Sequence, residues 1–168
     1  MRRFALILSF FALSAALLLA PAAFAASHTE MKAEAGAKAV VDEFNKIFES
    51  EDMAAFDRIF AHDADAVSFG TDAAERFVGF DALRKSVTSQ FASFEGSKLA
   101  VRDEVVKVSR GGDAAWFSEV VDWDTKAGGE AVSLKGCRFT GVLEKRDGAW
   151  KVVQFHASMP VQGQAAQY

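Results

Sequence analysis

The chain has 168 residues, of which 51% are hydrophobic, and a formal net charge of −4 at pH 7. This length suits one domain with a proper core and leaves no room for a second. The acidic balance disfavours nucleic acid and anionic membranes as partners, because both are bound through clustered Lys and Arg side chains. A single cysteine, Cys137, excludes an intrachain disulfide. We expect Cys137 to be a small buried apolar residue rather than a nucleophile, since no partner motif lies near it in the sequence.

The first 25 residues have the pattern of a cleaved secretory signal peptide. Two arginines precede an uncharged and mostly apolar run over 4–20, and the small-residue triplet Ala23-Phe24-Ala25 follows. These are the basic segment, the apolar segment and the cleavage site of a signal peptide, in that order. A retained membrane anchor is the alternative, but a spanning helix needs about 20 apolar residues. We therefore expect a mature chain that begins after residue 25 and is periplasmic or secreted, with no membrane contact.

Helices and two short strands are predicted in the first half of the mature chain. Ser27 and Glu30 have capping-box spacing, and apolar residues then recur at helical intervals to about Ser50. Asp52 can cap a second, short helix. Brief strands over 66–69 and 77–78 follow. The third helix is expected to be capped by Asp81 and to stop at Gly96.

After Gly96 the apolar period changes from helical to two. The alternation predicts four long strands, over 98–109, 114–124, 131–145 and 150–159. Their short, glycine-rich connections favour an antiparallel meander. Val105 and Val106 interrupt the alternation, which indicates a bulge. Helices followed by a meander predict an α+β domain over 26–160 with the helices on one sheet face, and the patternless tail over 161–168 is expected to be loose.

This order of elements, together with several local strings, resembles the nuclear transport factor 2-like superfamily, and in particular its SnoaL-like domain branch. The strings are Gly79-Phe80-Asp81-Ala82-Leu83, Arg138-Phe139-Thr140-Gly141-Val142-Leu143, Arg146-Asp147-Gly148-Ala149-Trp150-Lys151-Val152-Val153 and His156-Ala157-Ser158-Met159-Pro160. The last two strands are also similar, more distantly, to the association domain of calcium/calmodulin-dependent protein kinase II. The resemblance covers about residues 37–160. It implies a cone-shaped, curved antiparallel sheet wrapped around the N-terminal helices, a pocket in the cone, and frequent homodimers through the outer sheet face.

A pocket can be outlined from the alternation of the last strand. Its apolar set, Val153, Phe155, Ala157 and Met159, is expected to face inward, and Trp150, Val152, Gln154, His156 and Ser158 to face outward. The resemblance to the kinase association domain extends the inward face to neighbouring strands through Trp116, Ser118 and Asp122, and through Cys137, Phe139 and Gly141. The predicted ligand pocket therefore consists of Phe69, Trp116, Ser118, Asp122, Phe139 and Phe155. The alternative is that Trp116, Phe139 and Phe155 are plain core.

The relatives of the kinase association domain place arginines in this cone, at positions that align with Ser118, Gly141 and Ala157. None of these residues is basic here, which argues against a carboxylate ligand and favours an apolar one. Small-ligand pockets are commonly apolar with few polar groups.

Two residues are candidates for acid/base chemistry. Asp122 would lie on an apolar wall, which disfavours the charged form of a carboxylate, although a solvated Asp near the strand end is the alternative. On the opposite face, Glu119, Arg138 and His156 would form a polar cluster in a dimer interface. If the assignment of the faces is reversed, that cluster lines the pocket and His156 becomes the acid or base.

The sequence contains no recognisable metal, phosphate or nucleophile motif. We therefore predict no metal and no cofactor. Three functions stay open at this point. The first is an exported domain that binds a small, largely apolar molecule. The others are an isomerase, dehydratase or hydrolase that uses Asp122 or His156, and a non-catalytic dimeric interaction module.

Overall fold

The computed structural model describes residues 20–163 and residue 166. Most of the predicted signal peptide, over 1–25, and part of the predicted tail, over 161–168, lie outside the described residues. The helices are α1 (Ala20–Ser50), α2 (Met53–Ile59) and α3 (Phe80–Ser93). The strands are β1 (Val67–Phe69), β2 (Arg76–Val78), β3 (Phe94–Val108), β4 (Ala114–Ala127), β5 (Glu130–Arg146) and β6 (Ala149–Ser158).

The predicted N-cap is correct for α2 and wrong for α3. Asp52 is the N-cap of α2, and its carboxylate accepts a hydrogen bond of 3.0 Å from the backbone N–H of Ala55, as expected. The N-cap of α3 is Gly79, and Asp81 lies in the first turn instead. Gly79 has φ 84°, and a Cβ there would lie 2.7 Å from the carbonyl oxygen of Ala64. This tight turn therefore requires glycine.

The strands form one six-stranded sheet in the order β2-β1-β6-β5-β4-β3. The four long strands pair antiparallel as a meander, which confirms the predicted order. The sheet is not entirely antiparallel, because β1 pairs parallel with β6 where Phe69 lies beside His156. β1 adds to the edge of the meander that β6 leaves open, although the chain reaches β1 before α3 and the meander.

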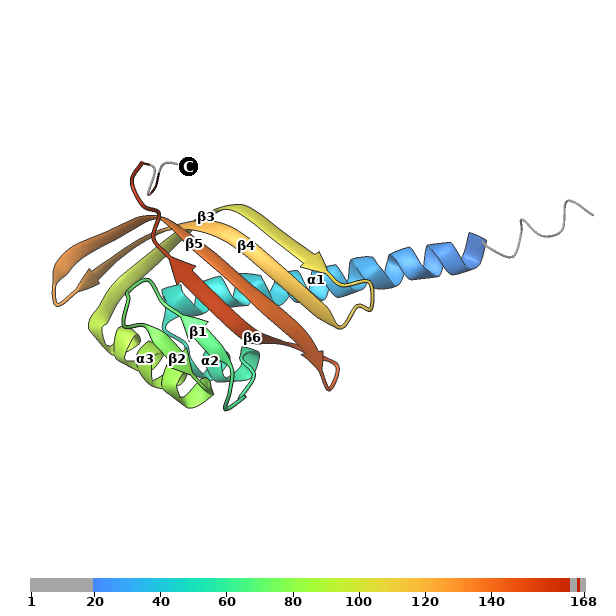
Figure 1. Cartoon of the computed structure of the whole chain (residues 1–168), viewed down its shortest axis with the longest axis horizontal. Coiled ribbons are helices and arrows are strands. Elements are labelled where there is room, and N and C mark those ends of the chain that lie inside the picture. Colours follow the sequence, from blue (N-terminus) through green and yellow to red (C-terminus); the bar gives the residue numbers. More distant parts are fainter. Residues whose placement is uncertain (1–19, 164–165, 167–168) are drawn as a thin grey trace, which may run out of the picture.

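The sheet curves around the helices (Figure 1). α2, α3 and the C-terminal part of α1 lie against its inner face, and the N-terminal end of α1 extends beyond it. Bulges contribute to this curvature. One falls between Arg102 and Val105, next to the predicted position, and Asp103 there has φ 56°. This is the α+β domain that the sequence predicts, with the cone-shaped sheet that the resemblance implies.

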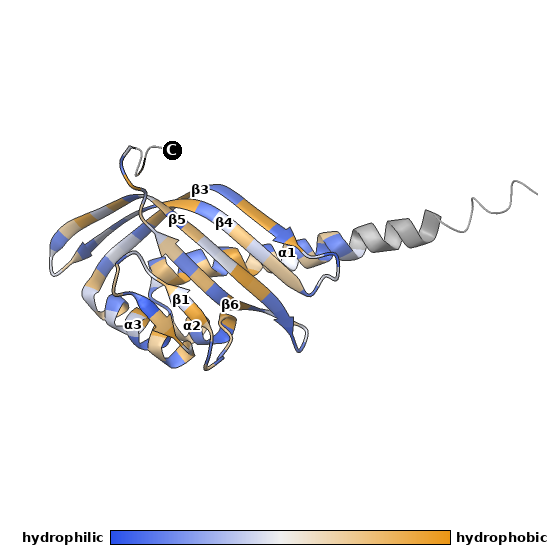
Figure 2. Ribbon diagram, viewed as in Figure 1, coloured by the Kyte–Doolittle hydropathy of each residue, from blue (hydrophilic) through white to orange (hydrophobic). Residues whose placement is uncertain are grey.

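The core lies between the inner sheet face and the helices. Hydrophobic and hydrophilic residues alternate along the long strands (Figure 2), as a sheet with one covered face requires. Phe44 of α1 is fully buried. Its ring centroid lies 4.8–6.2 Å from those of Phe48, Phe60, Phe117, Phe139 and Phe155. Each such buried ring contributes about 1.5–3 kcal/mol through removal from water.

Candidate functional site

A cavity of about 270 Å³ lies between the inner sheet face, α2, α3 and the loop that joins β1 to β2. Its walls are mainly aromatic. The aromatic lining residues are Phe48, Phe56, Phe60, Phe69, Phe77, Phe94, Trp123, Phe139 and Phe155. Leu83, Val87, Leu134, Cys137 and Ala157 add further apolar surface. A volume and lining of this kind suit a small apolar ligand.

Packed rings hold the deep wall of the cavity in place. Phe56 and Phe60 are one helical turn apart at α2, and their rings stack with centroids 4.2 Å apart. Phe139 of β5 and Phe155 of β6 meet edge to face at 5.3 Å. Because all four rings are buried in the core, the same residues contribute to stability and form the cavity wall.

The fold fills the cone beyond Gly141 with side chains. A Cβ at Gly141 would lie 2.4 Å from Cε1 of Phe117, so the Phe117 ring rests directly on the Gly141 backbone. The cavity therefore occupies only the other part of the cone, around Phe139 and Phe155.

The mouth of the cavity is polar and acidic. Thr71, Asp72 and Glu75 of the β1–β2 loop line it, together with Gln90 of α3. The Glu75 carboxylate accepts a hydrogen bond of 3.0 Å from the backbone N–H of Asp72. It also lies against Gly70, where a Cβ would be 2.2 Å from Glu75 Oε2. Gly70 thus leaves the space that the carboxylate occupies.

Three of the six predicted pocket residues line the cavity, and three do not. Phe69, Phe139 and Phe155 belong to its wall. Trp116, Ser118 and Asp122 lie on the outer sheet face, and Trp116 is 51% exposed. The expectation for β4 was therefore wrong. Its inward set is Ala115, Phe117, Glu119, Val121 and Trp123.

The predicted inward set of β6 is correct only toward its C-terminal end. Phe155 and Ala157 are buried, but so are Trp150 and Val152. The register shift after Val142 leaves Val153 as an extra residue in β6. An extra residue reverses the alternation of faces, so no single alternating set describes this strand.

Both acid/base candidates lie outside the cavity lining. Asp122 accepts a hydrogen bond of 2.7 Å from the backbone N–H of Gly136, and its carboxylate lies 3.9 Å from Nη2 of Arg102. It thereby supports the bulge at Gly136, where φ is 70°. His156 is exposed, with its ring 5.7 Å from that of Phe69. Neither residue is placed to act on a molecule in the cavity.

The inner face holds a buried carboxyl that we expected on the outer face. Glu119 is 3% exposed and accepts a hydrogen bond of 3.0 Å from Nδ2 of Asn45. Burial is the main cause that raises the pKa of Glu119 to about 7, and the nearby Glu104 and Asp42 act in the same direction. The Asn45 hydrogen bond and Lys38 oppose this shift. Glu119 does not line the cavity.

Cys137 lines the cavity, but its environment does not favour a thiolate. The side chain is fully buried, and burial raises the pKa of its thiol. Its Sγ lies 3.1 Å from Sδ of Met159, which is itself 37% exposed at the end of β6. Met159 was expected to face inward. Its sulfur does contact the inward Cys137, but the side chain as a whole is partly exposed. Within the described part of the chain, no group of three or more His, Cys, Asp or Glu residues could hold a metal ion.

Sequence reasoning missed Trp123, Asp72 and Glu75 as lining residues. The alternation of β4 carried a signal for Trp123, since Phe117, Val121 and Trp123 fall on one face. Nothing in the sequence marked the two loop carboxylates, because their position depends on the packing of β1 beside β6. Among the described residues, no helix is long and apolar enough to cross a membrane.

The fold is shared with solved structures of low sequence identity. A protein from Streptomyces avermitilis, assigned as a dehydratase of the NTF2-like family, is 18% identical with a TM-score of 0.68, over 76% of this chain and 96% of its own. A protein from Novosphingobium aromaticivorans, assigned as a scytalone dehydratase, is 15% identical with a TM-score of 0.68. The match covers 80% of this chain and 89% of that protein. A protein from Xanthomonas campestris, assigned as a calcium/calmodulin-dependent protein kinase II association domain, is 20% identical with a TM-score of 0.63. The match covers 75% of this chain and 86% of that protein.

At these identities the comparison supports the fold and not the activity. No curated protein sequence matches the chain. The model of the SnoaL-like domain family matches residues 37–162, which include the C-terminal part of α1, the other two helices and every strand of the described structure. The chain therefore belongs to the SnoaL-like domain family.

Proposed function

We propose that this protein binds a small, largely apolar molecule in the cavity of the cone, after export to the periplasm or the cell exterior. The cavity of about 270 Å³ with nine aromatic residues in its wall is the observation that carries the proposal. A ligand that buries about 200 Å² of apolar surface would gain about 5 kcal/mol before the costs of association. A gain of about 5 kcal/mol corresponds to a dissociation constant of about 0.2 mM before those costs, so weak binding, of roughly millimolar affinity, is expected.

Binding is favoured over catalysis by the composition of the lining. General acid/base catalysis needs a titratable group within hydrogen-bond reach of the reacting atoms. No His, Lys, Arg or Tyr occurs among the described lining residues, and the two carboxylates lie in the loop at the mouth. The relatives assigned as dehydratases share the fold, but Asp122 and His156 of this chain lie on the outer face.

A neutral fluorescent probe tests the proposal. N-phenyl-1-naphthylamine becomes fluorescent in apolar surroundings, and titration into residues 26–168 should give saturable binding at one site. Ala157→Phe should abolish binding, because Ala157 lies in the cavity wall. Ala100→Phe is the matched control, since Ala100 is exposed on β3. If Ala157→Phe fails to fold, Val87→Phe is a second variant that fills the same cavity, with the new ring on α3.

Equal binding by the wild type and both folded filled variants would contradict the proposal. Absence of saturable binding to the wild type would do the same.

We further propose that the protein forms a homodimer through the outer sheet face, as in related folds. Trp116 is 51% exposed, and its cross-strand neighbour Val142 is 37% exposed. Exposed large apolar side chains that adjoin in this way are typical of protein interfaces. Sedimentation analysis should find a dimer for the wild type and a monomer for Trp116→Lys. A monomeric wild type would refute this part.

A further inference from the structure

The charged residues in the lining of the cavity are both acidic. Asp72 and Glu75 are the only charged residues in the described lining. Some carboxylates elsewhere have basic partners, as in Asp57 with Arg84 and Asp63 with Arg146, each 2.7 Å apart. Among the described residues, no Lys, Arg or His forms an ion pair with the carboxylate of Asp72 or Glu75. The mouth therefore carries negative charge without a partner in the described chain.

The Glu75 carboxylate is held in a defined position. The backbone N–H of Asp72 donates to Oε2, and the Gly70 N–H donates to the Glu75 carbonyl at 2.8 Å. The second carboxylate oxygen, Oε1, accepts no hydrogen bond from the described residues and stays available to a ligand. Phe69 and Phe77 flank this loop on β1 and β2, and both line the cavity. An ammonium group beside the loop would meet carboxylates and aromatic faces, both of which attract cations.

The cavity wall also contains an indole donor without an acceptor. Trp123 is 7% exposed, and its Nε1–H has no hydrogen-bond partner among the described residues. Buried donors of this kind usually find a partner. A hydroxyl, ether or carbonyl oxygen on a ligand would provide one.

We propose that the ligand of this cavity is an apolar amine, with a ring body against the aromatic wall and a protonated amino group at Asp72 and Glu75. This inference rests on the proposed binding function and adds the charge of the ligand to it. The same carboxylates would repel a fatty acid or another anionic ligand, because charges of equal sign would meet at the mouth.

Three probes with the same ring test the charge preference by titration calorimetry of residues 26–168. They are 1-naphthylmethylamine, 1-naphthalenemethanol and 1-naphthaleneacetic acid, which are cationic, neutral and anionic at neutral pH. We expect the amine to bind about tenfold more tightly than the alcohol, from a partly exposed ion pair together with cation–π contact. The acid should bind most weakly, and added salt should reduce the preference for the amine.

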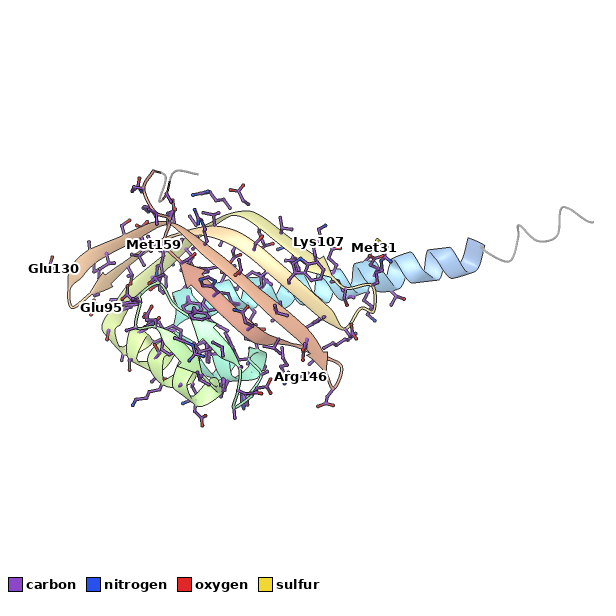
Figure 3. The ribbon with its side chains drawn as sticks, in the orientation of Figure 1. Met31, Glu95, Lys107, Glu130, Arg146 and Met159 are labelled. Atoms are coloured by element: carbon purple, nitrogen blue, oxygen red, sulfur yellow. The ribbon has the colours of Figure 1, made fainter. Side chains whose placement is uncertain are left out.

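The double variant Asp72→Asn/Glu75→Gln should bring the ratio of amine to alcohol affinity close to one. Both substitutions keep an acceptor carbonyl, so the hydrogen bond from Asp72 N–H to residue 75 can persist. The control Glu34→Gln/Glu130→Gln removes the same charge from exposed positions outside the lining and should preserve the ratio. Glu130 lies at the tip of the β4–β5 hairpin (Figure 3).

The outcomes separate the two proposals. If the amine and the alcohol bind equally, and Ala157→Phe abolishes both, the cavity function stands and the charge preference is wrong. A preference that survives the double variant would overturn the assignment to Asp72 and Glu75. If none of the three probes binds, both proposals fail.

Discussion

Replacing Glu119 with glutamine should stabilise the protein at alkaline pH and change little in acid. The carboxyl is 3% exposed, and its folded-state pKa of about 7 lies above the ordinary value of 4.5. Burial is the main cause, and the charges of Glu104 and Asp42 add to it. The folded state therefore holds a proton that the unfolded chain releases.

The magnitude follows from linkage between protonation and folding. Below the unfolded pKa of 4.5 both states are protonated, and Glu119 costs nothing. Between 4.5 and about 7 only the unfolded chain loses its proton, so the free energy of unfolding falls by about 1.4 kcal/mol per pH unit. The loss amounts to about 3 kcal/mol above the folded pKa, as an order of magnitude. The glutamine side chain of the Glu119→Gln variant would carry no charge and avoid this loss.

The hydrogen bonding between Glu119 and Asn45 also favours the Glu119→Gln substitution. Oε1 of Glu119 and Oδ1 of Asn45 are both buried without a partner. A protonated carboxyl, or the amide of glutamine, would supply a donor for the Asn45 oxygen while its own oxygen still accepts from Asn45 Nδ2.

Urea unfolding at about pH 4 and about pH 8.5 measures the effect. The wild type and Glu119→Gln should have similar midpoints in acid, and the variant should be more stable by about 3 kcal/mol in alkali. Glu130→Gln, at an exposed position, should show no such divergence. A Glu119→Gln variant that is destabilised equally at both pH values would refute the reasoning.

Three further substitutions or reactions test single contacts. Asp52→Ala should lower the free energy of unfolding by about 1 kcal/mol, because it removes the hydrogen bond that caps Ala55 N–H. Asp52→Asn should retain most of that stability, and equal losses in the two variants would contradict a capping role for Asp52. Gly141→Ala should cost about 1–3 kcal/mol in urea unfolding, since the new Cβ would lie 2.4 Å from the Phe117 ring; Thr140→Ala, at an exposed site on the same strand, should cost less. The Cys137 thiol lines the cavity but has a raised pKa, so it should react with a disulfide reagent much more slowly in the native protein than after unfolding; equal rates would show that its surroundings do not disfavour the thiolate.

The sequence predicted the elements of this fold well because local signals determine them. The N-cap at Asp52 and the glycine-rich turns each act over a few residues. The predicted helix stop at Gly96 is wrong by a few residues, because α3 ends at Ser93 and Gly96 lies within β3. The family resemblance then supplied the arrangement of the sheet. The parallel pairing of β1 with β6 was missed, because it joins segments far apart in the chain.

The site was predicted less well, since it depends on which face of each strand is covered. The extra residue Val153 reverses the alternation within β6. In β4 the inward set contains Glu119 and the outward set contains Trp116, so the charge and the large aromatic residue lie on the faces opposite to those expected. The positions of the mouth carboxylates Asp72 and Glu75 follow from the packing of a loop, which no local pattern encodes.

A crystal structure of residues 26–168 grown with N-phenyl-1-naphthylamine tests the central claim most directly. We expect the probe inside the cone, in contact with Phe139 and Phe155 and near the mouth at Phe69. A cone filled by side chains, or a probe bound only on the outer face against Trp116, would contradict it.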